Sequence, residues 1–131
     1  MNEKPKILIT DDSEINRALL KEILGDGYDY LEAEDGAAAV ELMRQRTDIS
    51  LLLLDLMMPG MDGYEATRAI RLSEKVDAAD IPIIALTANA FAEDAKAAHD
   101  AGMNAHLSKP LDFNKLKNIL ARIKKNGSVS L

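Results

Sequence analysis

The sequence contains no cysteine, which excludes disulfide bonds, thiol catalysis and thiolate metal sites. Its apolar runs, such as Ile7–Ile9 and Leu51–Leu54, are too short for a secretory signal or a membrane span. It also lacks an excess of positive charge, since the formal net charge is -6. A nucleic-acid surface usually needs a basic patch, so the charge argues against direct nucleic-acid binding. We therefore expect a cytoplasmic protein that makes no direct contact with nucleic acid or membrane.

The remaining composition is that of an ordinary globular domain. The chain has 131 residues, of which 47% are hydrophobic and 29% are charged. We expect one folded domain over residues 1–125. Four of residues 126–131 are asparagine, glycine or serine, and we expect a flexible tail or the start of a linker there.

Strand and helix patterns alternate along the chain. The candidate strands are Lys6–Thr10, Tyr28–Ala33, Ser50–Asp55, Ile81–Thr87 and Ala105–Ser108. The segments between and after them carry apolar residues at helical spacing, among them Ile15, Ala18, Leu19 and Ile23, then Phe91, Ala95 and Ala98, and finally Phe113, Leu116, Leu120 and Ile123. Strict alternation predicts an α/β fold, a doubly wound parallel sheet of five strands. Ser13 is the expected N-cap of the first helix, and Gly27 and Gly102 are at positions typical of helix-ending glycines.

Polar residues follow four of the five strands. They are Asp11 and Asp12 after the first strand, Asp55 at the end of the third, Thr87 at the end of the fourth and Lys109 after the fifth. The second strand offers only Glu34 and Asp35. Because ligands bind beyond the carboxyl ends of strands in an open parallel sheet, we expect these groups to meet at one edge.

This set of residue types favours phosphoryl chemistry. Clustered carboxylates repel one another unless a cation lies among them, and oxygen ligands alone favour Mg²⁺, or alternatively Mn²⁺. An aspartate such as Asp55 can act as a nucleophile and form an acyl phosphate. Lys109 and the hydroxyl of Thr87 would balance the charge of the phosphoryl oxygens. Each residue alone also has a structural explanation, such as helix capping by Asp11 and Asp12 or a turn at Lys109, so the prediction depends on the combination.

These residues lie in five segments that resemble the receiver domains of two-component response regulators. The segments are Ile9–Ser13, Ala33–Gly36, Leu53–Gly63, Ile84–Ala88 and Ala101–Pro110. The resemblance covers nearly the whole chain. It implies a flavodoxin-like sheet in the order 2-1-3-4-5 with helices on both faces. It also implies that Asp55 is phosphorylated, that Asp12, Asp55 and the carbonyl of Met57 ligate Mg²⁺, and that Asp11 acts through water. Thr87 and Lys109 would contact the phosphoryl group.

The resemblance further implies the partners of the domain. Four features look like those of receivers fused to hybrid sensor histidine kinases, namely Asn16, Met57, Asn89–Phe91 and Gly102–Asn104. A free-standing regulator is similar enough to stay open. The donor would be a histidine kinase or a histidine phosphotransfer domain. Homodimerisation on activation stays open as well.

Three functions are to be compared for this set of residues. The first is a phosphoacceptor that promotes its own phosphorylation and dephosphorylation without being an enzyme in the usual sense. It would switch a partner-binding face, with His106 either taking part in the switch or lying passively on the last strand. The second is an aspartate-nucleophile phosphatase, which commonly needs a second aspartate where this chain has Met57. The third is an interaction module that is not phosphorylated, against which the complete set of site residues argues. The other histidine, His99, is expected to be exposed.

Overall fold

The computed structural model of this protein describes residues 4–46, 48–56, 58, 60–72, 81–87, 96, 99–108, 114–118 and 121. Strands and helices alternate along these residues, as the sequence predicts. They are β1 (Lys6–Thr10), α1 (Glu14–Leu24), β2 (Asp29–Ala33), α2 (Gly36–Gln45), β3 (Ile49–Asp55), α3 (Gly63–Arg71), β4 (Ile83–Thr87) and β5 (Ala105–Ser108). Residues 99–101 and 114–118 are also helical. Phe91, Ala95, Ala98, Phe113, Leu120 and Ile123, which carried the last two predicted helices, lie outside the described residues. Within the described ranges, no helix is long and apolar enough to cross a membrane.

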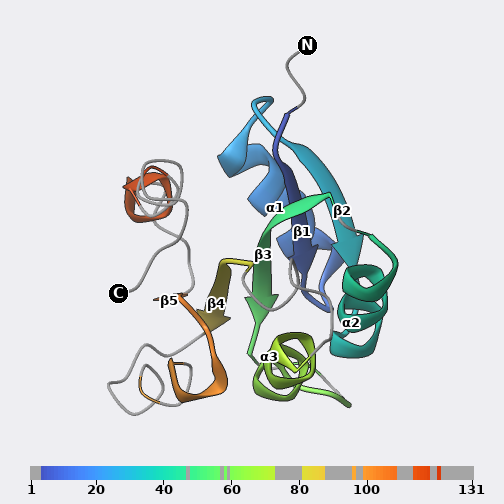
Figure 1. Ribbon diagram of the computed structural model, residues 1–131. Helices are drawn as coiled ribbons and strands as arrows, with labels where there is room; N and C mark the ends of the chain where they lie inside the picture. Colours follow the sequence, from blue (N-terminus) through green and yellow to red (C-terminus); the bar gives the residue numbers. More distant parts are fainter. Residues whose placement is uncertain are drawn as a thin grey trace.

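The five strands form one parallel sheet in the order β2-β1-β3-β4-β5, so the predicted doubly wound fold is confirmed (Figure 1). β1, β3 and β4 occupy the interior of the sheet, and their nearly continuous apolar sequences suit strands that are buried on both faces. β2 is an edge strand, and accordingly only its last residue, Ala33, is buried, whereas all residues of β3 except Ser50 are buried. All strands point the same way, so their carboxyl ends lie along one edge.

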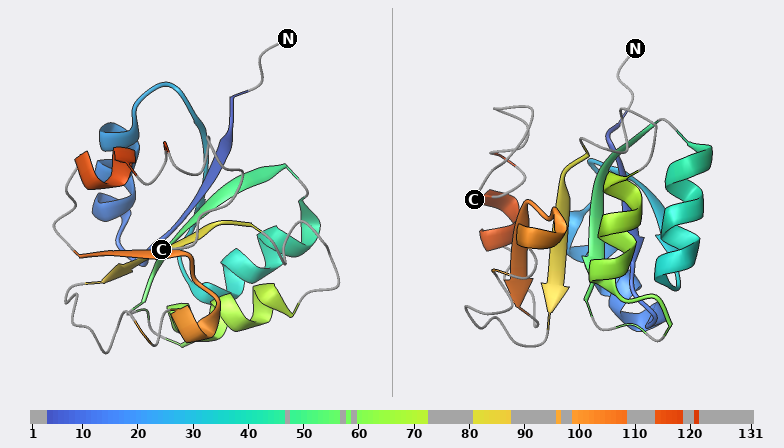
Figure 2. Two further views of the ribbon diagram at one scale, coloured as in Figure 1. Left: turned by 60° about the vertical axis from the view of Figure 1, so that its left-hand side comes forward. Right: turned by 60° about the horizontal axis from the view of Figure 1, so that its bottom comes forward.

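Helices cover both faces of the sheet (Figure 2). Alternate residues of the central strands point to opposite faces, which divides the buried side chains into two clusters. One cluster lies beneath α2 and α3 and includes Leu8, Leu52 and Leu54. The other lies beneath α1 and includes Ile7, Ile9 and, from the helical residues 114–118, Leu116. Burial on both faces fixes the register of the central strands and therefore the positions of the residues at their ends.

The apolar stripe predicted for the first helix does not mark its buried face. Ile15 and Leu19 are 74% and 53% exposed, and Ala18 is exposed as well. The buried residues of α1 are instead Arg17 and Leu20. In this orientation Leu20 is buried, Ile23 and Leu24 pack against the second cluster, and the guanidinium group of Arg17 finds acceptors in Asp11 and Glu32.

The predicted ends of the helices are confirmed at two positions and wrong at one. Ser13 caps α1, since its Oγ accepts a hydrogen bond from the backbone N–H of Asn16 at 3.2 Å. Gly102 has a φ of 107° directly after helical residues, as a helix-ending glycine should. The first helix, however, ends at Gly25 and not at Gly27. Gly25 has a φ of 81°, which explains why a residue without Cβ stands there.

Candidate functional site

Three aspartates meet at the carboxyl edge of the sheet. Asp11 and Asp12 follow β1 directly, and Asp55 is the last residue of β3. Because Thr10 of β1 is in register with Leu54 of β3, the two strands deliver their acidic residues side by side. One carboxylate oxygen of each aspartate lies within 4.8 Å of those of the other two. The structure therefore brings together the acidic residues that the strand ends singled out, which we call the acidic cluster.

The acidic cluster fits a hard divalent cation. Asp11 is fully buried, Asp55 is 4% exposed and Asp12 is exposed, so one side of the cluster opens to solvent. Carboxylates this close repel one another, and more strongly where protein excludes water. Oxygen donors that carry negative charge suit Mg²⁺ or Mn²⁺ better than softer metals. The fourth predicted ligand, the carbonyl of Met57, lies outside the described residues.

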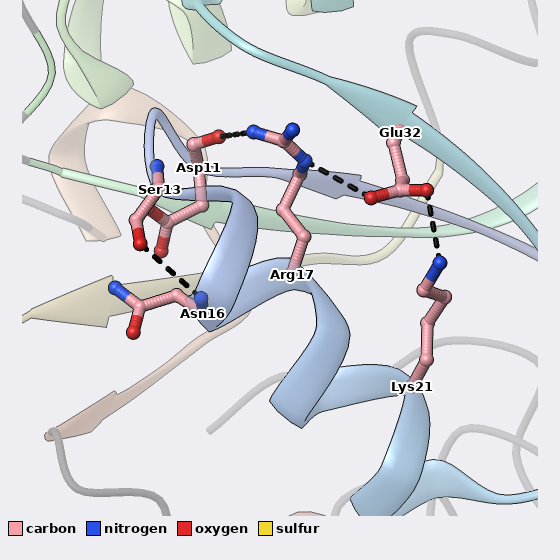
Figure 3. A network of polar contacts seen from close by, with 6 residues as sticks. All are labelled: Asp11, Ser13, Asn16, Arg17, Lys21 and Glu32. Carbon is pink, nitrogen blue, oxygen red and sulfur yellow. Dashed lines mark hydrogen bonds and ion pairs between the residues drawn. The ribbon is translucent and has the colours of Figure 1, made fainter.

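Hydrogen bonds hold Asp11 from three directions, and Figure 3 shows the one from Arg17. Its backbone N–H donates to the carbonyl of Ala33 in β2 at 3.2 Å. Its carboxylate Oδ1 accepts from the backbone N–H of Ser13 at 2.9 Å, and its carbonyl accepts from Nη1 of Arg17 at 2.7 Å. Asp11 is therefore fixed by β2, by the turn before α1 and by α1 itself.

The segment after Asp55 folds back closely against it. The backbone N–H of Leu56 donates to the carbonyl of Leu86 at 2.9 Å, and the N–H of Gly63 donates to the carbonyl of Leu56 at 3.2 Å. A Cβ atom on Gly63 would lie 2.6 Å from the carbonyl oxygen of Asp55 and 2.8 Å from Cα of Leu56. Only glycine allows α3 to begin this close to Asp55. Asp62 caps α3 by accepting from the N–H of Glu65 at 2.9 Å.

Thr87 is the last residue of β4 and is 5% exposed. Asp55 of β3 is in register with Leu86, so Thr87 lies one position beyond it on the neighbouring strand. The structure thus places the predicted hydroxyl at the same edge as Asp55. Lys109, the predicted cation, lies outside the described residues, and so does Ala88.

The other predicted polar residues lie apart from the acidic cluster. Asp35 caps α2, because its Oδ1 accepts from the N–H of Ala38 at 2.7 Å. The sequence offers only Glu34 and Asp35 after the second strand, and Asp35 acts there as a helix cap. His99 is exposed, as expected. His106 is half-buried in β5, opposite Ala85 of β4, and its part in a switch stays a prediction.

Sequence reasoning missed Arg17. It is only 8% exposed, and its guanidinium group joins the acidic cluster to β2 through Glu32. A signal was present, because Arg17 lies three residues before Leu20 and seven before Leu24, on one face of the helix. Arginine usually lies on the solvent face of an amphipathic helix, so a hydrophobic pattern assigns Arg17 to the exposed face.

The fold is a doubly wound parallel sheet, and its candidate site is a cluster of carboxylates at the carboxyl ends of the strands. These two features together define the class of protein to which this chain is to be compared. The sequence matches the family described as "Response regulator receiver domain" over residues 7–121. This match covers most of the chain, and the chain belongs to that family.

Curated relatives with similar sequences are receiver regions of hybrid sensor histidine kinases. The chain is 37% identical over 120 residues to the sensor protein GacS of Pseudomonas syringae pv. syringae, covering 90% of this chain and 13% of GacS. It is 42% identical over 122 residues to the sensor protein EvgS of Escherichia coli, covering 92% of this chain and 10% of EvgS. The chain therefore spans only about a tenth of the length of such relatives.

A similar solved structure is the receiver domain of the sensor histidine kinase PA1611 from Pseudomonas aeruginosa. The two chains are 36% identical and superpose with a TM-score of 0.81, covering 92% of this chain and 97% of the other. That structure has a magnesium ion coordinated in its active-site cleft.

Proposed function

We propose that this domain accepts a phosphoryl group on Asp55 from a phosphohistidine donor in a Mg²⁺-dependent reaction. The observation that carries the proposal is the acidic cluster, in which the buried carboxylate of Asp55 lies within 4.8 Å of those of Asp11 and Asp12. As a receiver domain of a two-component relay, the chain implies a histidine kinase or phosphotransfer partner. The proposed receiver unit covers residues 1–125, and residues 126–131 would form a tail or linker.

In the proposed reaction, an oxygen of the Asp55 carboxylate attacks the phosphorus atom of a phosphoimidazole. A P–O bond forms, the P–N bond breaks, and the imidazole nitrogen leaves with its electron pair and takes up a proton. Thr87 would donate its hydroxyl to a phosphoryl oxygen, and Lys109 would place its ammonium group beside another. Mg²⁺, held by Asp12, Asp55 and the carbonyl of Met57 with Asp11 acting through water, would neutralise the remaining charge of the phosphoryl oxygens.

The donor must reach the open side of the acidic cluster. Asp12 is exposed there, and Ile15 follows three residues later on the first turn of α1. Ile15 and Leu19 are the exposed large apolar side chains of this helix. We propose that they contact the apolar surface of the donor domain while its phosphohistidine points at Asp55.

Phosphorylation would then shift the domain between two states. The proposed signalling face includes β5, the preceding helix and the following one, and most of these two helices lies outside the described residues. At this face the domain would exchange between two conformations, and contacts of Thr87 and Lys109 with the phosphoryl group would favour one of them. His106 is the residue of β5 that we propose to follow the change.

Intact mass measurement after incubation with acetyl phosphate and Mg²⁺ tests the phosphoacceptor role. We expect addition of one phosphate to the parent chain, none without divalent metal and none in Asp55→Asn. Asp35→Asn is the matched control, because Asp35 follows the end of β2 and caps α2, and asparagine caps helices equally well. The control should accept phosphate like the parent. The proposal is wrong if the parent gains no phosphate under any metal condition, or if Asp55→Asn still gains one.

A further inference from the structure

Arg17 is a buried cation beside a site that is expected to bind a cation. Its side chain is 9% exposed, and Nη1 donates to the carbonyl of Asp11 at 2.7 Å. Moving a guanidinium group out of water is costly unless it is paired and hydrogen-bonded. Simple charge repulsion would keep such a residue away from a metal site. Its presence therefore needs an explanation in the contacts that it makes.

Glu32 and Lys21 hold the guanidinium group of Arg17 in one orientation (Figure 3). Nε of Arg17 donates to Oε1 of Glu32 at 3.0 Å, and Nζ of Lys21 donates to Oε2 of the same carboxylate at 3.0 Å. Glu32 belongs to β2, while Arg17 and Lys21 lie one turn apart on α1. The carboxylate balances the charge of Arg17 and directs Nη1 toward the end of β1.

The carbonyl of Asp11 belongs to the peptide that joins Asp11 to Asp12. Fixing this oxygen fixes the plane of the peptide, because the peptide unit is rigid. The side chain of Asp11 is also tied to the N–H of Ser13, whereas Asp12 is exposed. The direction in which Asp12 leaves the backbone therefore depends on the peptide plane that Arg17 holds.

We propose that Arg17 is a positioning residue for metal binding, which sets the orientation of the Asp11–Asp12 peptide and so brings both carboxylates to the ion. This inference rests on the proposed function, since it takes the acidic cluster as the Mg²⁺ site. Groups that orient metal ligands from behind commonly change metal affinity by about tenfold to a hundredfold when they are removed.

Two explanations for the burial of Arg17 predict opposite changes in Mg²⁺ affinity when the residue is replaced. If Arg17 acted only through its charge, Arg17→Met would remove a positive charge near the cluster and tighten Mg²⁺ binding. If it acts by holding the peptide, the same substitution weakens binding by about tenfold or more. Arg17→Lys keeps the charge but replaces the planar fork with a single ammonium group, which cannot serve the Asp11 carbonyl and Glu32 in the same geometry. It should therefore weaken binding as well.

The test is a Mg²⁺ titration of the parent and the variants by NMR, following the backbone amide signals of Asp12 and Ser13. Arg46→Met is the matched control, because Arg46 forms an exposed ion pair with Asp48 and its loss changes the net charge by the same amount. Urea unfolding without Mg²⁺ is measured alongside, so that a loss of stability is separated from a loss of affinity. We expect weaker binding in both Arg17 variants and parent-like binding in Arg46→Met.

The outcomes separate this inference from the proposed function. If Arg17→Lys is folded and binds Mg²⁺ as tightly as the parent, the inference is overturned while phosphorylation of Asp55 stands. If Arg17→Met does not fold, the affinity of Arg17→Lys decides. If the parent itself binds no Mg²⁺, the inference is overturned together with the metal-dependent function.

Discussion

Replacing Gly63 with alanine should destabilise the domain and disturb Asp55 at the same time. The new Cβ would lie 2.6 Å from the Asp55 carbonyl oxygen and 2.8 Å from Cα of Leu56, and both are backbone atoms that cannot rotate away. Forcing an extra carbon into a packed site costs about 1–3 kcal/mol. Because both clashing atoms are backbone, the upper end of this range, about 3 kcal/mol, applies here. Alanine favours the helix by at most about 1 kcal/mol over glycine, so we expect a net loss of about 2 kcal/mol.

Urea unfolding followed by circular dichroism measures this loss. With a typical slope of about 2 kcal/mol per M, the midpoint should fall by about 1 M. Since the backbone of Asp55 must move to admit the new carbon, the rate of phosphate acceptance from acetyl phosphate should fall about tenfold as well.

Two other glycines provide matched controls. Gly27 has open space around its Cβ position and no positive φ, so Gly27→Ala should leave the midpoint unchanged. Gly25 also has open space but a φ of 81°, so Gly25→Ala should cost only the backbone strain, about 1–2 kcal/mol, without slowing phosphorylation. The reasoning is refuted if Gly63→Ala unfolds at the same urea concentration as Gly27→Ala, or if it accepts phosphate at the parent rate.

Two further predictions concern other polar contacts. Hydrogen bonds from Lys21 and Arg17 hold the pKa of Glu32 below its usual value of 4.5. Ionised Glu32 therefore stabilises the fold above pH 4.5, and this effect is lost as the pH falls through the lower pKa of the folded state. The difference in stability between the parent and Glu32→Gln, measured by urea unfolding, should be present at pH 7 and vanish in acid; a difference that does not change with pH would contradict this. Oδ1 of Asn104 accepts hydrogen bonds from the N–H of Ile83 and from Nη2 of Arg71, both at 2.8 Å. Asn104→Ala should therefore lower the free energy of unfolding by about 2 kcal/mol in the same urea experiment, and Asn104→Asp, which keeps the acceptor, should lower it by less. Equal losses in the two variants would contradict the role of Oδ1.

The sequence pattern was sufficient to predict the strands and the residues at their ends, and the resemblance to receiver domains implied the strand order. β1 and β5 coincide with the predicted ranges, and β2, β3 and β4 differ by one or two residues at their starts. The prediction succeeded because buried parallel strands have continuous apolar sequences, and because parallel topology brings their carboxyl ends to one edge. The acidic cluster follows from these two facts alone.

The orientation of α1 could not be predicted in the same way. Ile15 and Leu19 have the spacing of a buried stripe, yet they are exposed, and Arg17 is buried in their place. Hydrophobic spacing ranks residues by their side chains alone, whereas the burial of Arg17 depends on a backbone carbonyl and on Glu32 in another strand. Contacts of this kind are formed only when the sheet is assembled, so a local pattern does not reveal them.

The position of Asp55 on β3 determines how often the backbone that carries it can open. β3 is hydrogen-bonded to β1 on one side and β4 on the other, and residues 51–55 are all buried. Backbone in such a central strand exchanges its amide hydrogens only when the whole domain unfolds, while loops at the edge open far more often. The backbone that carries the carboxylate is therefore expected to stay in place in any local opening short of global unfolding. A phosphoryl group bound there would keep its attachment point for as long as the domain stays folded.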